Sequence, residues 1–246
     1  MDVRLDKFLK DQGIAARSEL KALIRKGCVR VNNQPEKDPG AHIDPEKDQI
    51  AINGEPVLYR KFVYYMINKP KGLITATEDK TLATVLDLFP ENIRRRNVFP
   101  VGRLDRDTEG LLIITDDGVF AHNVISPKKH VMKLYEAKLD SFPGHEAIRD
   151  FENGIVLDDG YKAMPAKLRM ISECPVTAQV EIYEGKFHQV KRMFKAAGST
   201  VQELKRLRIG EVWLDEALKP GEFRELTPEE VVILGGAQNI THGAEL

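Results

Sequence analysis

The segment at residues 101–110 concentrates side chains that could do chemistry. Its sequence, VGRLDRDTEG, packs five charged residues and two glycines into ten positions immediately before the apolar run 111–114. A loop at a strand end is where a scaffold presents reactive groups. Asp105 stands between Arg103 and Arg106, and a cation within about 4–6 Å favours the ionised form of a carboxylate. An ionised, fixed carboxylate can act as a covalent nucleophile, although Asp105 could instead cap a turn and pair with an arginine.

A second segment, residues 186–208, is strongly basic. Seven basic side chains are opposed by one acidic residue, Glu203, which leaves a local charge of +6. Such a stretch suits an anion or a nucleic-acid backbone, and a solvated helix face is the alternative. His188 has no companion ligands at metal-binding spacing, so we expect a polar or RNA-facing histidine. The basic residues are Lys186, Lys191, Arg192, Lys195, Lys205, Arg206 and Arg208.

Tyr135 lies in the sequence KLYEAKL at residues 133–139, which predicts a strand. Alternation along a strand puts Leu134 and Tyr135 on opposite faces of the sheet. A tyrosine on a strand usually belongs to the core. It could instead stack on a base or take part in proton transfer.

The remaining pattern predicts an α+β fold that must position these groups. Apolar, β-prone runs alternate irregularly with short helical segments, without a regular βαβ repeat. We therefore expect a mixed, largely antiparallel sheet flanked by helices. The expected strands are residues 63–67, 111–114, 133–139, 166–171 and 177–183, and the expected helices are residues 82–88, 119–125 and 189–197.

The first 58 residues predict a separate module with a pair of helices and short strands. Residues 1–30 carry eight basic and four acidic side chains (+4), whereas residues 31–60 carry three basic and six acidic ones (−3). The basic helix pair offers a surface to phosphates, although a solvated helix face has the same pattern. We expect helices at residues 3–10 and from a cap at Ser18 to Gly27, strands at 28–31 and 48–52, a turn at Asn32-Asn33 and a loop at 35–45.

Composition limits the possible partners. The 246 residues are 30% charged but carry a net charge of −1, so a nucleic-acid-binding surface requires basic residues sorted onto one face. No apolar run reaches the roughly 18 residues of a membrane span, and the charged start lacks the apolar core of a signal peptide. Cys28 and Cys174 are the only cysteines, and we expect both to be reduced core thiols. These features favour a cytoplasmic protein without a membrane partner.

The N-terminal segment resembles the alpha-L RNA-binding module, first known from a small-subunit ribosomal protein. The family usually has Asn-Gly at the turn where this chain has Asn32-Asn33, and Asn also adopts the left-handed conformation. The resemblance implies RNA binding and no chemistry. The matched residues are Arg4-Leu5-Asp6, Ala16-Arg17-Ser18, Leu23-Ile24 and GCVRVN at residues 27–32.

The chain as a whole resembles the RsuA-like family of ribosomal RNA pseudouridine synthases. With the N-terminal module, the resemblance spans about 90% of the chain. Five motifs in the family's order are far more specific than any one of them. They are NKPKG at residues 68–72, GRLDRDTEGLLIITDDG at 102–118, KLYEAKL at 133–139, EGKFHQVKRMFKAAG at 184–198 and ELKRLRIG at 203–210.

The resemblance implies an isomerase that needs no cofactor and no metal. It assigns the nucleophile to Asp105, an active-site tyrosine to Tyr135 and a basic partner of the aspartate to Lys191. Asp105 would attack the nucleotide at ribose C1′ or at the uracil ring, and Leu204 would wall the pocket. The expected RNA contacts are Arg4, Arg17, Lys21, Arg25, Lys69, Arg103, Arg106, Lys186, His188, Gln189, Arg192, Lys205 and Arg206.

The expected organisation is an RNA-binding module at residues 1–58, a linker at 59–62, a catalytic domain at 63–236 and a tail at 237–246. The sequence HQVKRMF at 188–194 is similar to that of family members acting on small-subunit RNA, whereas members acting on large-subunit RNA tend to be arginine-rich there. We therefore expect a partner in small-subunit ribosomal RNA, free or in an assembling particle, and a monomeric protein.

Three other interpretations stay open at this point. The protein could modify large-subunit RNA. It could be a non-catalytic RNA-binding factor of ribosome assembly that kept the fold. It could also be a carboxylate-based glycosidase or a metal-dependent nuclease that uses Asp105, Asp107 and Asp116-Asp117.

Overall fold

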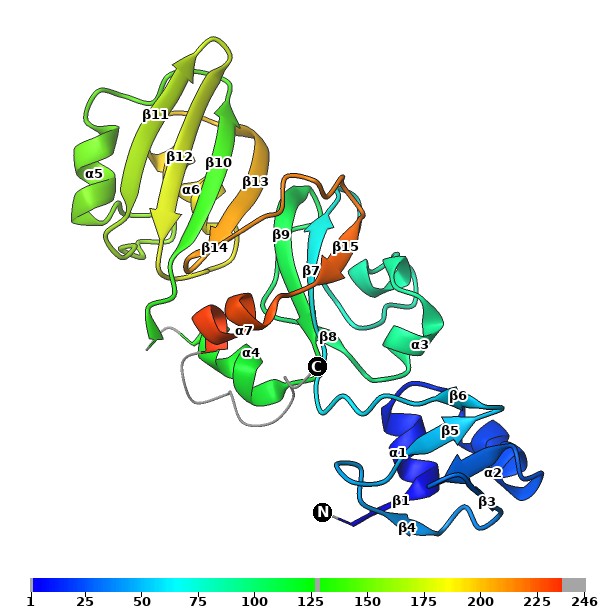
Figure 1. The fold of residues 1–246 in the computed structure, drawn as a ribbon. Helices are drawn as coiled ribbons and strands as arrows, with labels where there is room; N and C mark the ends of the chain where they lie inside the picture. Colours follow the sequence, from blue (N-terminus) through cyan, green and yellow to red (C-terminus); the bar gives the residue numbers. More distant parts are fainter. Residues whose placement is uncertain (1, 127–128, 236–246) are drawn as a thin grey trace. The chain divides into compact units, whose positions relative to one another are not determined.

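The computed structural model describes residues 2–126 and 129–235, and these form two compact units (Figure 1). The first contains the chain up to Val63 together with Phe89–Phe99, and the second contains Tyr64–Leu88 and the chain from Pro100 onward. Residues 89–99 were expected in the catalytic domain, so their place in the first unit differs from the expected division. The tail expected at 237–246 lies outside the described residues. None of the described helices has the length and apolar character needed to cross a bilayer.

The first unit packs two helices on short strands. Its apolar core consists of one face of each helix and the inner side of the strands, including Leu5, Leu9, Leu20, Ile24 and Val29, all 0% exposed. The turn expected at Asn32-Asn33 is confirmed, with φ values of 50° and 65°. The elements are β1 (Val3–Arg4), α1 (Leu5–Asp11), α2 (Arg17–Arg25), β2 (Val29–Val31), β3 (Gln34–Glu36), β4 (His42–Ile43), β5 (Ile50–Ile52), β6 (Glu55–Pro56) and α3 (Glu91–Arg94).

Two local expectations for this unit were wrong. The cap of α2 is Ala16 rather than Ser18, because the Glu19 carboxylate accepts the Ala16 backbone N–H at 3.1 Å and starts the helix two residues earlier. The loop expected at residues 35–45 contains parts of β3 and β4, which pair with β2 and β1.

The second unit is built on one sheet of nine strands within the described residues. The strand order is β11-β12-β10-β13-β9-β7-β15, with β14 on β13 and β8 on β9. The mixed, largely antiparallel sheet flanked by helices is confirmed. The strands are β7 (Tyr64–Lys69), β8 (Phe99–Pro100), β9 (Thr108–Thr115), β10 (Lys133–Leu139), β11 (Lys167–Glu173), β12 (Val176–Ile182), β13 (Val201–Ile209), β14 (Val212–Trp213) and β15 (Phe223–Glu225).

Helices cover both halves of this sheet (Figure 1). Helix α5 (Ala147–Asn153) and helix α6 (Gln189–Ala196) pack together through Phe151 and Phe194, whose ring centroids are 5.3 Å apart. Helix α4 (Gly118–Ile125) packs against α7 (Pro228–Gly235). Only one turn of 3-10 helix, η1 (Val85–Leu88), forms where a helix was expected at 82–88. Cys174 is exposed beyond β11 and Cys28 is half-buried, so the expectation of two core thiols was wrong.

A short parallel seam joins the two halves of the sheet. Strand β9 pairs with β13 in parallel over three residue pairs, of which the last is Gly110 with Arg206. A Cβ at position 110 would lie 2.2 Å from the Arg206 carbonyl oxygen, and Gly110 has a φ of +104°. This position therefore requires glycine, both for the close approach of β13 and for the backbone conformation.

Candidate active site

A hollow opens where the parallel seam begins. Its volume is about 400 Å³, which includes the solvent-filled space at its open mouth. Four segments that are apart in the sequence contribute to it: residues 103–108 at the start of β9, strand β10, residues 182–190 from the end of β12 to the start of α6, and strand β13. The lining residues are Arg103, Leu104, Asp105, Thr108, Tyr135, Ile182, Gly185, Lys186, His188, Gln189, Val190 and Leu204.

Asp105 lies at the hollow beside two basic side chains of the α6 segment. Its carboxylate is 3.3 Å from Lys191 Nζ and 3.6 Å from His188 Nε2, and its side chain is 29% exposed. The loop and helix thus bring together an aspartate and a lysine that are separated by 86 positions in the sequence. The Lys191 ammonium is within ion-pair distance of the Asp105 carboxylate, a group that can act as a covalent nucleophile.

Lys191 also contacts a second carboxylate. Its Nζ donates to Asp107 Oδ1 at 2.5 Å, and the Asp107 side chain is 71% exposed. Burial raises the pKa of Asp107, but the hydrogen bond and positive charge of Lys191 outweigh burial and hold this pKa below its usual range. Asp107 does not line the hollow. Of the two carboxylates on Lys191, only Asp105 is therefore in position to meet a ligand there.

Tyr135 forms part of the wall and lies against a buried arginine. Tyr135 is 7% exposed, and Arg206, its neighbour across the β10–β13 pair, is 4% exposed. The Arg206 Nη1 donates to the Tyr135 hydroxyl at 3.4 Å, the guanidinium lies 5.9 Å from the ring centre, and Nε donates to the Leu111 carbonyl at 2.7 Å. Arg206 was expected to contact RNA. That expectation was wrong, because the side chain points into the core and supports the tyrosine.

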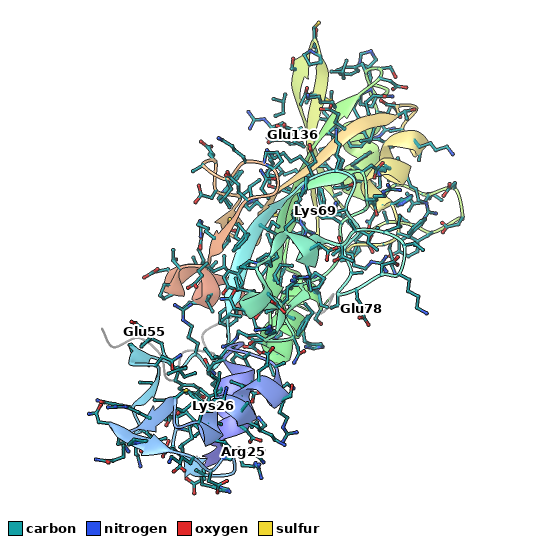
Figure 2. All side chains as sticks on the ribbon, turned by 90° about the vertical axis from the view of Figure 1, so that its right-hand side faces the viewer. Arg25, Lys26, Glu55, Lys69, Glu78 and Glu136 are labelled. Atoms are coloured by element: carbon teal, nitrogen blue, oxygen red, sulfur yellow. The ribbon has the colours of Figure 1, made fainter. Side chains whose placement is uncertain are left out.

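Lys69 is a second buried cation, and its expected RNA contact was also wrong. Its side chain is 0% exposed at the end of β7, inside the second unit (Figure 2). The ammonium donates to the carbonyls of Pro70, Asp105 and Thr108 at 3.0–3.1 Å. Burial lowers the pKa of Lys69 to about 8. Lys69 therefore fixes the backbone on both sides of the Asp105 carboxylate and cannot reach a phosphate.

A buried carboxylate holds the turn at residues 184–189. Glu184 is 7% exposed and accepts hydrogen bonds from the Tyr161 hydroxyl at 2.6 Å, the Met164 N–H at 2.8 Å and the Gln189 amide at 2.7 Å. The Gln189 amide oxygen in turn accepts the Lys186 N–H at 2.8 Å. Gln189 is thus an internal support of the turn, and it also lines the hollow, where its expected RNA contact stays a prediction.

The remaining basic candidates of the second unit fall into two groups. Arg103 and Lys186 are exposed and line the hollow, and Arg106 is exposed nearby in the sequence with its Nε donating to the Gly72 carbonyl at 3.1 Å, so all three keep donors that can meet an anionic ligand. Arg192 instead pairs with Asp158 and Asp159 at 2.6 and 2.7 Å, and its expected RNA contact would have to compete with both. Lys205 is half-buried on the sheet face opposite Leu204 and so points away from the hollow.

In the first unit, a buried aspartate organises the expected basic surface. Asp6 is 0% exposed, and its carboxylate lies 3.0 Å from Arg4 and 3.5 Å from Arg17. The hydrogen bond from Arg4 lowers the pKa of Asp6. Both arginines remain about half exposed, Lys21 is half-buried and Arg25 is exposed at the end of α2 (Figure 2). This face keeps basic groups that can meet phosphates.

The aspartates required by the nuclease alternative do not gather at one place. Asp105 precedes β9, whereas Asp117 follows it, and eight strand residues span about 25 Å. Asp117 caps α4 by accepting the Val119 and Phe120 N–H groups and also accepts the Tyr64 hydroxyl. Within residues 2–126 and 129–235, no cluster of three or more His, Cys, Asp or Glu side chains is placed to hold a metal ion.

Similarity to known proteins shows the family to which the chain belongs. Residues 63–196 match the family model described as RNA pseudouridylate synthase, and residues 3–50 match the S4 domain model. The first match contains the Asp105 loop, Tyr135 and Lys191. The chain belongs to the RNA pseudouridine synthase family.

Relatives of this pseudouridine synthase match it over almost the whole chain. The RNA pseudouridine synthase YtzG of Bacillus subtilis is 47% identical, covering 96% of this chain and 100% of the relative. The ribosomal large subunit pseudouridine synthase B of the same organism is 39% identical (93% and 93%), and the ribosomal small subunit pseudouridine synthase A of Yersinia pestis is 38% identical (95% and 98%). A crystal structure of a pseudouridylate synthase superposes with a TM-score of 0.67 at 35% identity, covering 94% of this chain and 99% of that one.

Membership of this family defines the class of reaction that the protein catalyses. Pseudouridine synthases isomerise uridine to pseudouridine in RNA, and the S4 domain is an RNA-binding domain. The expected RsuA-like family and its N-terminal RNA-binding module are confirmed.

Proposed function

We propose that this pseudouridine synthase modifies one uridine of small-subunit ribosomal RNA, with Asp105 as the nucleophile. The observation that carries the proposal is the single hollow lined by Asp105, Tyr135 and Leu204, with Lys191 in contact with the aspartate. The sequence HQVKRMF at residues 188–194 supports the small subunit, since it is similar to that of family members acting on that RNA.

Pseudouridine formation breaks the bond from ribose C1′ to uracil N1 and joins the base through C5. No atom is gained or lost, so the protein must supply a nucleophile, a place to hold the detached base and a group that handles protons. In our proposal Asp105 attacks the nucleotide while the Lys191 ammonium, 3.3 Å away, orients its carboxylate. Tyr135 packs against the uracil and assists proton movement at C5, with the Arg206 guanidinium behind it.

The target uridine must leave its stack to reach Asp105. Flipping costs a few kcal/mol, which contacts to the pocket and to phosphates offset. We assign the phosphate contacts to the exposed Arg103, Arg106 and Lys186 and to the basic helix face of the S4 domain. RNA affinity should therefore fall steeply as salt is added, because each neutralised phosphate releases counterions.

Chemical mapping of pseudouridine tests the proposal. Purified protein is incubated with ribosomal RNA from cells that lack it, both as naked RNA and in assembling particles. We expect one new pseudouridine in small-subunit RNA. A new pseudouridine in large-subunit RNA alone would overturn the subunit assignment. No new pseudouridine in any of these RNAs would contradict the proposed substrate altogether.

The cation beside Asp105 provides a second test. Lys191→Gln removes the charge but keeps a polar side chain of similar reach. We expect it to lower the single-turnover rate by roughly 10²-fold, as loss of one electrostatic group in an active site typically does. Lys191→Arg restores a cation and should recover most of that loss. Single-turnover rates at saturating RNA would measure both, and an unchanged rate for Lys191→Gln would remove Lys191 from the mechanism.

A further inference from the structure

Phe187 presents an open aromatic face beside the active site. It is 75% exposed, the highest fraction among the large hydrophobic side chains of the described chain. Its ring stacks on the imidazole of His188, with centroids 3.8 Å apart and planes inclined by 18°. One face of the phenyl ring is therefore covered by His188. The other face contributes nothing to the core and is open to a further flat group.

The stacked pair is held on a rigid turn. His188 has a left-handed backbone conformation, with φ 50° and ψ 29°, at the N-terminal cap of α6. The buried Glu184–Gln189 hydrogen bond and the Lys186 N–H to Gln189 bond fix the backbone on both sides of Phe187. A side chain on a fixed backbone loses less conformational freedom when it binds a ligand, so this pair is organised in advance for stacking.

The position of the pair points to a specific ligand. His188 Nε2 is 3.6 Å from the Asp105 carboxylate, so Asp105, His188 and Phe187 follow one another in contact. The neighbouring Lys186 and Arg103 are exposed and basic. An RNA strand whose uridine enters the hollow must carry its adjacent nucleotide past this pair. That nucleotide has lost a stacking neighbour through the flip, and unpaired bases in RNA are commonly bound on aromatic side chains.

We propose that Phe187, backed by His188, is a stacking platform for the unpaired base next to the target uridine. The inference rests on the proposed function, because it requires a uridine in the Asp105 pocket. Every base has a flat face, so the platform selects an unpaired neighbour rather than a particular base. It would favour targets in loops or distorted helices over uridines in continuous duplex.

A fluorescent RNA tests the platform without turnover. Asp105→Asn protein is titrated with two nine-nucleotide oligouridines that carry 2-aminopurine on the 5′ or the 3′ side of the central uridine. Stacking of 2-aminopurine quenches its emission. We expect saturable quenching with one of the two probes. Adding Phe187→Ala should raise Kd by about 5- to 150-fold and remove the quenching at saturation, and Phe187→Trp should restore both.

The matched control is Phe142→Ala in the same Asp105→Asn background. Phe142 is 46% exposed beside His145 but lies away from the hollow, so its loss should leave Kd and quenching unchanged. Equal Kd and equal quenching for the Phe187→Ala protein would overturn the platform, as would the absence of quenching with both probes. Mapping with wild-type protein is a separate readout, so failure of the platform is distinguishable from failure of the proposed function.

Discussion

Asp105→Asn protein should form no measurable pseudouridine, with a rate reduced by roughly 10⁴-fold or more, as expected when a covalent nucleophile is lost. Asparagine has nearly the same shape but carries no charge and is a poor nucleophile. RNA affinity should stay within a few-fold of wild type, because the phosphate contacts lie elsewhere. Single-turnover assays with mapped RNA and a filter-binding titration would measure the two quantities separately.

The neighbouring carboxylate makes a stringent control. Asp107 contacts the same Lys191 Nζ at 2.5 Å but does not line the hollow. Asp107→Asn should therefore lower the rate by less than about 10-fold, since an exposed ion pair contributes little. Full turnover by the Asp105→Asn protein, or equal losses in the two variants, would contradict the assignment of the nucleophile.

Lys69→Met should have the largest effect on stability. The variant leaves the carbonyls of Pro70, Asp105 and Thr108 without their buried donor. We expect the free energy of unfolding to fall by about 2–4 kcal/mol, and the rate to fall by at least about 10²-fold because the Asp105 loop loses its support. Lys71→Met is the control: its side chain is 40% exposed and pairs with Glu203 at 3.4 Å, so it should cost under about 0.5 kcal/mol.

Urea unfolding at several pH values tests the burial of Lys69 directly. Burial lowers its pKa to about 8 from 10.5. Between these values the unfolded chain binds more protons than the folded chain, so Lys69 makes the free energy of unfolding rise with pH in this window. The variant lacks this contribution, so the difference between wild type and Lys69→Met should widen from pH 8 to 10. A constant difference would contradict the assigned pKa.

Strands in which apolar and polar residues alternate were predictable from the sequence, whereas β13, where a charged residue interrupts this pattern, was not. Burial alternates from Tyr135 to Leu139, and β10 spans the expected range. Strand β13 escaped prediction because Arg206 occupies a buried position in it, so a charged residue stands where the pattern of a strand demands an apolar one. Its guanidinium donates from Nε to the Leu111 carbonyl and from Nη1 to the Tyr135 hydroxyl, and these contacts join segments that are distant in the sequence.

The sequence predicted which residues lie at the hollow, but it did not predict the buried residues that hold them in place. The motifs directed attention to Asp105, Tyr135, Lys191 and Leu204, and the fold brings these residues to one place. Charge counting could not separate basic residues on the surface from those inside. Lys69 and Arg206 belong to basic segments but are 0% and 4% exposed. Lys69 donates hydrogen bonds to backbone carbonyls, and Arg206 donates to the Leu111 carbonyl and to the hydroxyl of the buried Tyr135. Glu184 was not singled out at all, since its partner Tyr161 lies 23 positions away.

The glycine at the parallel seam limits how this enzyme can be redesigned. The backbones of β9 and β13 approach closely at Gly110, so any larger residue would force the strands apart two residues beyond Thr108 and Leu204, which line the hollow. Engineering aimed at a new RNA target therefore has little freedom at the seam. It has far more at exposed side chains such as Arg103 and Phe187, which can be replaced without disturbing the packing of the strands.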